Sequence, residues 1–217
     1  MVRSAVIFGN HPKFPKVCRM NYLAHAYLSF NEPGLLVGNM ISDFVKGKKQ
    51  FDYPSEIRQG IRLHHAIDQF TDEHEATKEL KAFFKPAYRL YAGAFADVTY
   101  DHFLANDTRI FPSKDKLKTF TTTSYTILQQ YAKDLPPRFA MMLPHMIEHD
   151  WLYNYQFREG IRRSFGGLVR RSAYLTESDR AFDLFNEHYE AMEACYTVFF
   201  PELEAFAVRH LHGGLNS

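Results

Sequence analysis

The sequence has few cysteines and no long hydrophobic run. Its two cysteines, Cys18 and Cys195, lie far apart in 217 residues, so a disulfide framework is not indicated and a reducing cytoplasm is expected. No apolar run approaches the roughly 20 residues that a membrane helix needs. The apolar stretch near the N-terminus is shorter than the roughly 7 to 15 residues of a signal-peptide core. We therefore predict a soluble, cytoplasmic protein without a membrane span.

An excess of charge of one sign is also missing. The 26 Lys and Arg residues nearly balance the 25 Asp and Glu residues, which gives a formal net charge of +1. This balance argues against a nucleic-acid partner, which a strongly basic chain would indicate, and against the acidic excess of many disordered chains. With 46% hydrophobic and 16% aromatic residues, the chain is instead expected to form one sizeable core.

The first nineteen residues differ in texture from the rest of the chain. They contain two prolines and a Gly-Asn pair and show no sustained periodicity. We interpret residues 1–19 as an N-terminal extension, with Met20 as an alternative start, and residues 20–217 as a single domain. A short ordered arm that packs on the domain is the other interpretation, and both remain open.

From Met20 onward, apolar residues recur at the spacing of helices. The segment "LLVGNMISDFVKG" keeps this period and stops at Gly47, a residue type that often follows the end of a helix. A later helix is expected to end before Pro86, because proline disrupts a helix interior. The pattern predicts an all-α fold, a single-domain helical bundle, with helical segments in residues 21–30, 35–47, 53–74, 74–84, 88–107, 113–135, 138–172 and 176–211.

Ionisable side chains interrupt several of these apolar segments. His64 and Asp68 are four residues apart, so they lie on one face of a helix with Cβ atoms about 6 Å apart and can converge on one point. Asp97 and Asp101 repeat this spacing, and His102 follows at once. Imidazole and carboxylate groups together suit Mn, Fe, Zn or Mg to varying degrees.

Two further polar residues, His25 and Asp43, stand in apolar stretches where an unpaired charge would be costly. Each feature alone has a structural explanation, because a lone histidine is often a hydrogen-bonded core residue and an i, i+4 pair is often a surface hydrogen bond. Their recurrence on several helices favours a shared cation, since one ion would compensate groups that are unfavourable to bury separately. We therefore expect a metal site.

The motifs "MNYLAHAYLS", "GNMISDFVKG", "GIRLHHAID", "DVTYDHFLA" and "HDWLYNY", in this order, resemble those of acyl carrier protein phosphodiesterases. The similarity runs from Met20 to about Arg171. It implies an all-helical protein related to the HD-type metal phosphohydrolases, which hydrolyses holo acyl carrier protein to apo acyl carrier protein and 4′-phosphopantetheine. It also implies a divalent metal ion, Mn²⁺ before all others, with Mg²⁺ or Fe²⁺ as alternatives.

The resemblance implies a role for each polar residue named above. By position, Asp43 matches the aspartate of the family's "DF" motif, and His25 falls in its opening "LAH". The expected metal ligands are His25, Asp43, His64, Asp68 and Asp101. Asp97 and His102 are expected to support the ligands, transfer protons or bind a second ion. The predicted catalytic set therefore comprises Asp43, His64, Asp68, Asp97, Asp101 and His102.

The implied substrate is an acidic protein, so basic residues are expected around the site. The candidates for substrate contact are Lys46, Arg62, Arg162 and Arg163. His65 stands where the resemblance leads us to expect an arginine, a departure that bears on phosphate or carrier-protein contact. Two alternatives remain open: a helical phosphohydrolase of a nucleotide or another small phosphoester, and a non-enzymatic binding module whose polar residues form hydrogen-bonded networks.

Overall fold

A computed structural model describes residues 22–213, and every regular element in that range is a helix. The predicted all-α fold is thereby confirmed for the described residues, whose buried apolar side chains form one hydrophobic core with contributions from all the α-helices. The predicted extension, residues 1–19, lies outside the described residues. Between Tyr22 and Gly213, no helix is both long and apolar enough to cross a bilayer.

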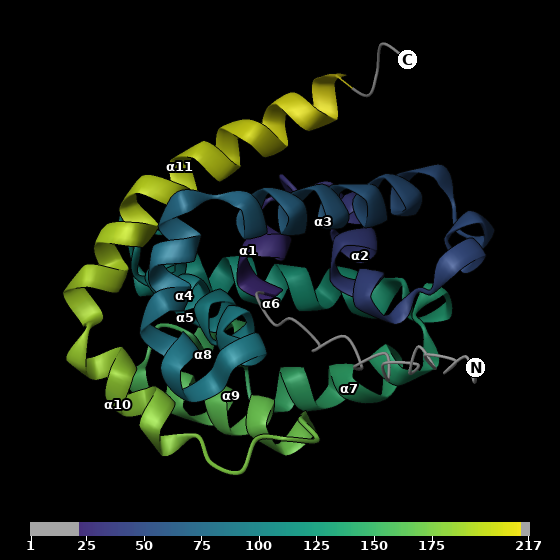
Figure 1. Cartoon of the computed structure of the whole chain (residues 1–217). Coiled ribbons are helices and arrows are strands. Elements are labelled where there is room, and N and C mark those ends of the chain that lie inside the picture. Colours follow the sequence, from purple (N-terminus) through teal and green to yellow (C-terminus); the bar gives the residue numbers. More distant parts are fainter. Residues whose placement is uncertain (1–21, 214–217) are drawn as a thin grey trace, which may run out of the picture.

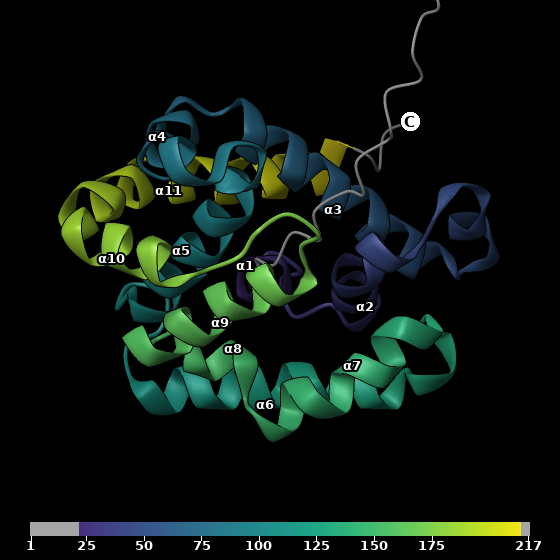
Figure 2. The same ribbon diagram turned by 60° about the horizontal axis from the view of Figure 1, so that its bottom comes forward.

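The first two helices lie in the middle of the molecule. α1 (Tyr22–Tyr27) and α2 (Pro33–Ile41) lie between α3 (Ser55–Glu73) on one side and the chain from α6 (Lys114–Gln130) to α9 (Arg158–Arg171) on the other (Figures 1 and 2). Nearly all residues of α1 and α2 are buried. Polar side chains on these two helices therefore face protein groups and not water.

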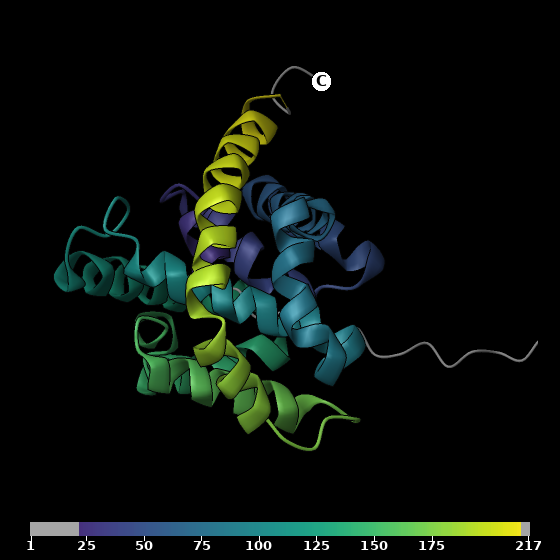
Figure 3. The same ribbon diagram turned by 60° about the vertical axis from the view of Figure 1, so that its left-hand side comes forward.

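α5 (Ala92–Asn106) is buried on all sides, with Gly93 and Asn106 as its exceptions. Most of its residues are apolar, but it also buries Asp97, Asp101 and His102. α5 contacts α1, α4 (Glu75–Tyr88), α9 and α11 (Tyr189–Gly213). Figure 3 shows α11, in yellow, extending across these helices. The remaining elements are η1 (Ser42–Phe44), η2 (Gly47–Asp52), η3 (Arg89–Tyr91), η4 (Ala132–Asp134), α7 (Pro137–Glu148), α8 (Trp151–Asn154) and α10 (Asp179–Glu187).

α2 and α3 approach each other closely at two glycines. A Cβ atom added to Gly38 would lie 2.0 Å from the carbonyl oxygen of Ile57, and one added to Gly60 would lie 2.3 Å from that of Leu35. Both clashes involve backbone atoms of a helix, which cannot move aside as the end of a side chain can. The interface therefore requires glycine at both positions, because only residues without a side chain allow the two helices to lie this close together.

The chain around Asp43 differs from the continuous helix predicted up to Gly47. α2 ends at Ile41, and the 3₁₀ turn η1 follows. Gly47 has a φ of 57° and opens η2, so it does not follow the end of a helix. Hydrophobic periodicity did not reveal the change, because a short 3₁₀ turn buries its apolar residues at nearly the same spacing as an α-helix.

α4 continues through Pro86 to Tyr88, so the prediction that it ends before the proline was wrong. Proline lacks the N–H that would donate to the carbonyl group four residues earlier. Here that carbonyl belongs to Ala82, which is exposed. Because water can satisfy an exposed carbonyl group, the last turn of the helix tolerates the proline.

His102 links α5 to two later segments. Its Nδ1 lies 2.7 Å from the carbonyl oxygen of Tyr155 and therefore carries the hydrogen, so Nε2, 3.0 Å from the Tyr189 hydroxyl, accepts. The residue is 2% exposed, and burial lowers the pKa of His102 from 6.5 to about 4. A neutral histidine thus joins α5 to the chain after α8 and to the start of α11.

Replacing either interface glycine with alanine is predicted to destabilise the fold. Gly38→Ala and Gly60→Ala should each lower the free energy of unfolding, measured by urea denaturation, by about 1–3 kcal/mol, the usual cost of overpacking. Gly93→Ala is the matched control, because a Cβ there meets nothing closer than the Lys81 Cε at 3.5 Å. This variant should be stabilised by up to about 1 kcal/mol. Equal destabilisation of Gly93→Ala and Gly38→Ala would contradict the argument.

The lowered pKa of His102 predicts sensitivity to acid. Between pH 6.5 and about 4 the unfolded chain binds a proton at this histidine and the folded chain does not, so the free energy of unfolding falls as the pH is lowered through this window. The loss from this residue approaches about 1.4 kcal/mol per pH unit. Urea unfolding between neutral pH and about pH 4 should show a weaker pH slope for His102→Gln than for the native chain. His210→Gln, at an exposed histidine, should keep the native slope; a native slope in His102→Gln would speak against a neutral, buried ring.

Candidate metal centre

Two imidazoles from different helices stack on each other. His25 of α1 and His64 of α3 are buried, and their ring centroids lie 4.0 Å apart with ring planes at 14°. Asn39 of α2 holds both rings: its side-chain Oδ1 is 2.7 Å from Nδ1 of His25, and its carbonyl oxygen is 2.8 Å from Nδ1 of His64. Both acceptors require a hydrogen on Nδ1, so the lone pair of each ring is on Nε2.

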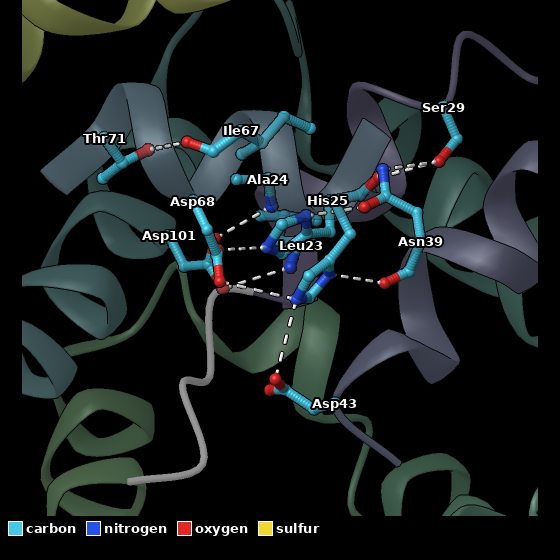
Figure 4. A network of polar contacts seen from close by, with 11 residues as sticks. Leu23, Ala24, His25, Ser29, Asn39, Asp43, Ile67, Asp68, Thr71 and Asp101 are labelled. Atoms are coloured by element: carbon cyan, nitrogen blue, oxygen red, sulfur yellow. Dashed lines mark hydrogen bonds and ion pairs between the residues drawn. The ribbon is translucent and has the colours of Figure 1, made fainter. Parts of the chain in front are cut away.

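Two carboxylates face these Nε2 atoms (Figure 4). Nε2 of His25 lies 3.5 Å from Asp68, and Nε2 of His64 lies 3.6 Å from Asp68 and 3.7 Å from Asp43. These distances are too long for hydrogen bonds, and neither Nε2 has a hydrogen-bond partner within residues 22–213, although both are buried. We call His25, Asp43, His64 and Asp68 the candidate metal centre.

The separations within the candidate metal centre fit a divalent cation. Ligand atoms that lie about 2.1 Å from an ion are roughly 3.0–3.5 Å from one another. The donor atoms of His25, His64 and Asp68 all lie within 4.8 Å of one another, and the 3.5–3.7 Å contacts need little contraction. Two imidazole nitrogens with carboxylate oxygens are also a ligand set that divalent transition metals accept.

The charges of the cluster favour a cation as well. Burial and the neighbouring His64 lower the pKa of His25. Burial alone would lower the pKa of His64 too, but Asp43 and Asp68 outweigh it and raise that pKa. Since the stacked rings do not both carry a proton readily, two carboxylates face at most one positive charge. The cluster is therefore left with net negative charge, which a divalent ion would neutralise.

The packing of α2 on α3 positions these groups. Gly60 lies one turn before His64 on α3, and Asn39 directly follows Gly38 on α2. The close contact of the two helices at the glycines therefore brings the Asn39 carbonyl within hydrogen-bond distance of His64. Asp68 then reaches the same point from one turn further along α3, as the i, i+4 spacing predicts.

Asp101 contacts the backbone that carries His25. Its two carboxylate oxygens accept hydrogen bonds from the amides of Leu23, at 3.0 Å, and Ala24, at 2.8 Å. Complete burial raises the pKa of Asp101 well above its usual range, the two amides oppose this rise, and nearby Asp97 adds to it. Asp101 thus holds the start of α1 in place, and its role as a ligand stays a prediction.

The other two predicted catalytic residues lie on α5 with Asp101. Asp97 is buried one turn before Asp101. His102 points both ring nitrogens at Tyr155 and Tyr189, in the network described above. The hydrogen bonds of His102 to Tyr155 and Tyr189 connect α5 to the chain after α8 and to the start of α11. The catalytic roles of Asp97 and His102 stay predictions.

Lys46 and Arg62, the two predicted substrate-contact residues in the first half of the chain, lie in different segments. Lys46 is exposed three residues after Asp43, so it follows the candidate metal centre directly in the chain. Arg62 is exposed on α3 two positions before His64, which places it about 160° away around the helix. Lys46 is thus near the centre in sequence, whereas Arg62 projects from the other side of α3.

Arg162 and Arg163 lie on α9 and have partners there and on α10. Arg162 pairs with Asp179 at 3.4 Å, and its guanidinium lies 5.0 Å from the centroid of the Phe182 ring. Arg163 pairs with Glu159, one turn earlier, at 3.2 Å. The roles of the four basic residues in substrate binding stay predictions.

Asn39 is a residue of the site that the sequence analysis did not single out. It is fully buried, and its Nδ2 donates to the carbonyl oxygen of His25 at 2.8 Å and to Oγ of Ser29 at 3.2 Å, in addition to its contacts with both imidazoles. Its signal in the sequence is a polar residue in an apolar helix. The same signal had drawn attention to Asp43, four residues later.

Comparison with known proteins gives a consistent result. A family model described as "Acyl carrier protein phosphodiesterase" matches residues 20–203. A protein of that name from Klebsiella pneumoniae (strain 342) is 32% identical over 188 residues, which cover 87% of this chain and 97% of the relative. Another from Enterobacter sp. (strain 638) is 30% identical over 184 residues, which cover 85% and 95% of the two chains.

A third protein of the same name, from Salmonella agona (strain SL483), is 32% identical over 192 residues, which cover 88% of this chain and 98% of the relative. No solved structure matches the chain significantly. The range matched by the family model includes the whole candidate metal centre. The chain belongs to the acyl carrier protein phosphodiesterase family.

Proposed function

We propose that this chain hydrolyses holo acyl carrier protein to apo acyl carrier protein and 4′-phosphopantetheine, with a divalent cation bound at the candidate metal centre. The family and the names of the relatives support the substrate and the phosphodiester bond. The observation that carries the metal dependence is the convergence of two buried Nε2 lone pairs and two carboxylates on one point.

Mn²⁺ is the proposed ion, with Fe²⁺ and Mg²⁺ as alternatives. Mg²⁺ prefers oxygen ligands and keeps several waters, so a site with two imidazole nitrogens suits Mn²⁺ or Fe²⁺ better. When bound, such an ion lowers the pKa of a water molecule and neutralises charge on the non-bridging phosphate oxygens. Both effects address the resistance of a phosphodiester to attack by water.

The residues of the chain prepare this site before any ion binds. Asn39 fixes the tautomer of both rings, so that Nε2 and not Nδ1 faces the carboxylates. Asp101 holds the first turn of α1, which places His25. The side chain of Asp43 is 23% exposed, so it is a ligand that solvent and substrate can approach.

A short basic stretch next to Asp43 is the proposed contact for the carrier protein. Lys46, Lys48 and Lys49 are all exposed in and just before η2. The net charge of the whole chain is close to zero, so attraction of an acidic partner has to come from such a local group. Its place directly after a proposed metal ligand would bring the bound carrier protein close to the ion.

The direct test is incubation of the purified chain with holo acyl carrier protein and Mn²⁺, read by intact mass. The native chain should remove the prosthetic group, and Asp68→Asn should lower the rate by more than about 100-fold, because it replaces an ionised ligand. Asp72→Asn is the matched control, since Asp72 lies one turn further on α3 and pairs with Lys81 at 2.7 Å; this variant should keep the native rate.

Two outcomes would count against the proposal. One is an undiminished rate in Asp68→Asn, and the other is an unchanged carrier-protein mass after incubation with the native chain and Mn²⁺, Fe²⁺ or Mg²⁺. Turnover of a small phosphodiester such as bis(p-nitrophenyl) phosphate, without turnover of holo carrier protein, would favour the alternative of a small-phosphoester hydrolase.

The role of Asn39 predicts a second effect, on metal binding itself. Asn39→Ala removes the side-chain Oδ1 that orients His25, while the backbone carbonyl oxygen that holds His64 remains. This variant should weaken Mn²⁺ binding by about 10- to 100-fold, measured by titration of the metal-free chain with Mn²⁺ in an electron paramagnetic resonance assay. Ser29→Ala removes the Ser29 contact to Asn39 but leaves both imidazole contacts, so it should bind Mn²⁺ with near-native affinity. Equal weakening in the two variants would show that Asn39 acts through general stability.

A further inference from the structure

The last turn of α7 carries a second group of metal-ligating side chains. His145, Glu148 and His149 each offer a donor atom, and these atoms all lie within 4.8 Å of one another. All three residues are exposed, so an ion can reach them from solvent without movement of the fold. His149 is the first residue of the "HDWLYNY" motif, whereas His145 and Glu148 lie outside the motifs quoted above, and the group is not among the residues that the proposed hydrolysis uses.

The spacing of the group suits coordination of one ion. Residues at i, i+3 and i+4 share one face of a helix, and two histidines at i, i+4 are the arrangement by which helices bind zinc in several hydrolases. Nδ1 of His145 is 3.8 Å from Oε2 of Glu148, which is too long for a hydrogen bond. This distance is closer to the separation of two ligands of one ion than to the length of a direct hydrogen bond.

The backbone of this turn is held in place. The amide of His149 donates to the carbonyl oxygen of His145 at 3.1 Å, and Nδ2 of Asn154 donates to the carbonyl oxygen of His149 at 2.7 Å. The two histidines therefore keep their helical spacing up to the end of α7. The C-terminal end of a helix also carries partial negative charge, which favours a cation there.

This group is distinct from the candidate metal centre. Phe139, near the start of α7, packs against Phe44, the neighbour of Asp43, with ring centroids 5.4 Å apart. His145 and His149 lie six and ten residues beyond Phe139, which is roughly 9 and 15 Å along the helix axis. Because ligands lie within about 2.3 Å of a bound metal, no single ion can bridge the two groups.

We propose that His145, Glu148 and His149 form a second, surface-exposed metal site that binds Zn²⁺. Two imidazoles and a carboxylate supply three ligands of a tetrahedral zinc ion, and the fourth position stays open to water or to a ligand from a partner molecule. An exposed site with these ligands binds Zn²⁺ more tightly than Mn²⁺, as the general order of divalent-metal affinities requires.

The test counts the zinc ions that the full chain retains. Metal-free protein is dialysed to equilibrium against buffered Zn²⁺ and then analysed for bound metal. The native chain should hold one more Zn²⁺ ion than the double variant His145→Ala/His149→Ala, whose substitutions are exposed and should leave the circular dichroism spectrum unchanged. The matched control is His210→Ala/His212→Ala, which removes two exposed histidines of α11 at a spacing that does not share a face; it should retain the native number.

A further variant tests the contribution of the carboxylate. Glu148→Gln keeps the size of the side chain but removes its anionic donor, and it should weaken Zn²⁺ binding at this site by an amount on the order of tenfold. Equal Zn²⁺ retention by the native chain and the His145/His149 double variant would overturn the proposal, as would an equal loss in the His210/His212 control. Zinc retention does not depend on hydrolysis of carrier protein, so this proposal and the proposed function can fail independently.

Discussion

The close contact between the backbones of α2 and α3 at Gly38 and Gly60 is the constraint on which the site depends. No side chain fits between the helices there. Because both positions are glycines, the helices come close enough for the Asn39 carbonyl oxygen to contact the ring of His64. The side chain of the same asparagine holds His25. One short segment of α2 therefore fixes the orientation of two imidazoles that arrive from α1 and α3, and the geometry of the candidate metal centre follows from how tightly two helices pack.

The buried polar groups around this contact divide into those that hydrogen-bond to protein groups and those, such as the two Nε2 atoms, that have no hydrogen-bond partner within residues 22–213. Asp101 is paired with two backbone amides, and His102 with a carbonyl oxygen and a hydroxyl. Each is costly to bury alone, and each is compensated by protein groups. The Nε2 atoms of His25 and His64 are instead held 3.5–3.7 Å from carboxylates. A network that only stabilised the core would close these gaps to hydrogen-bond length, so the arrangement favours a cation over a purely structural role.

The two groups of proposed metal ligands differ in burial and in the elements that supply them. The candidate metal centre combines three separate elements and is largely buried, and Asn39 orients its two imidazole rings. The group at the end of α7 comes from a single helical turn, is exposed and depends on helical spacing alone. Burial and two carboxylates distinguish the first group, whereas exposure makes the second accessible to an ion from solvent.

The sequence by itself determined the helical class and the local spacing of the key pair. Periodicity predicted the helical regions, although the predicted segments 138–172 and 176–211 contain three and two separate helices. The i, i+4 rule placed His64 and Asp68 on one face, because it depends only on neighbours within two turns of the chain. Polar interruptions of apolar stretches pointed to His25 and Asp43, but not to which groups meet. Only the tertiary structure decided that Asp43 sits in a 3₁₀ turn, that Asp101 holds the backbone of α1 and that Asn39 joins the two rings. The contacts of Asp101 and Asn39 link residues from different helices, and their distances are set by how closely the helices pack, which no local pattern of residues records.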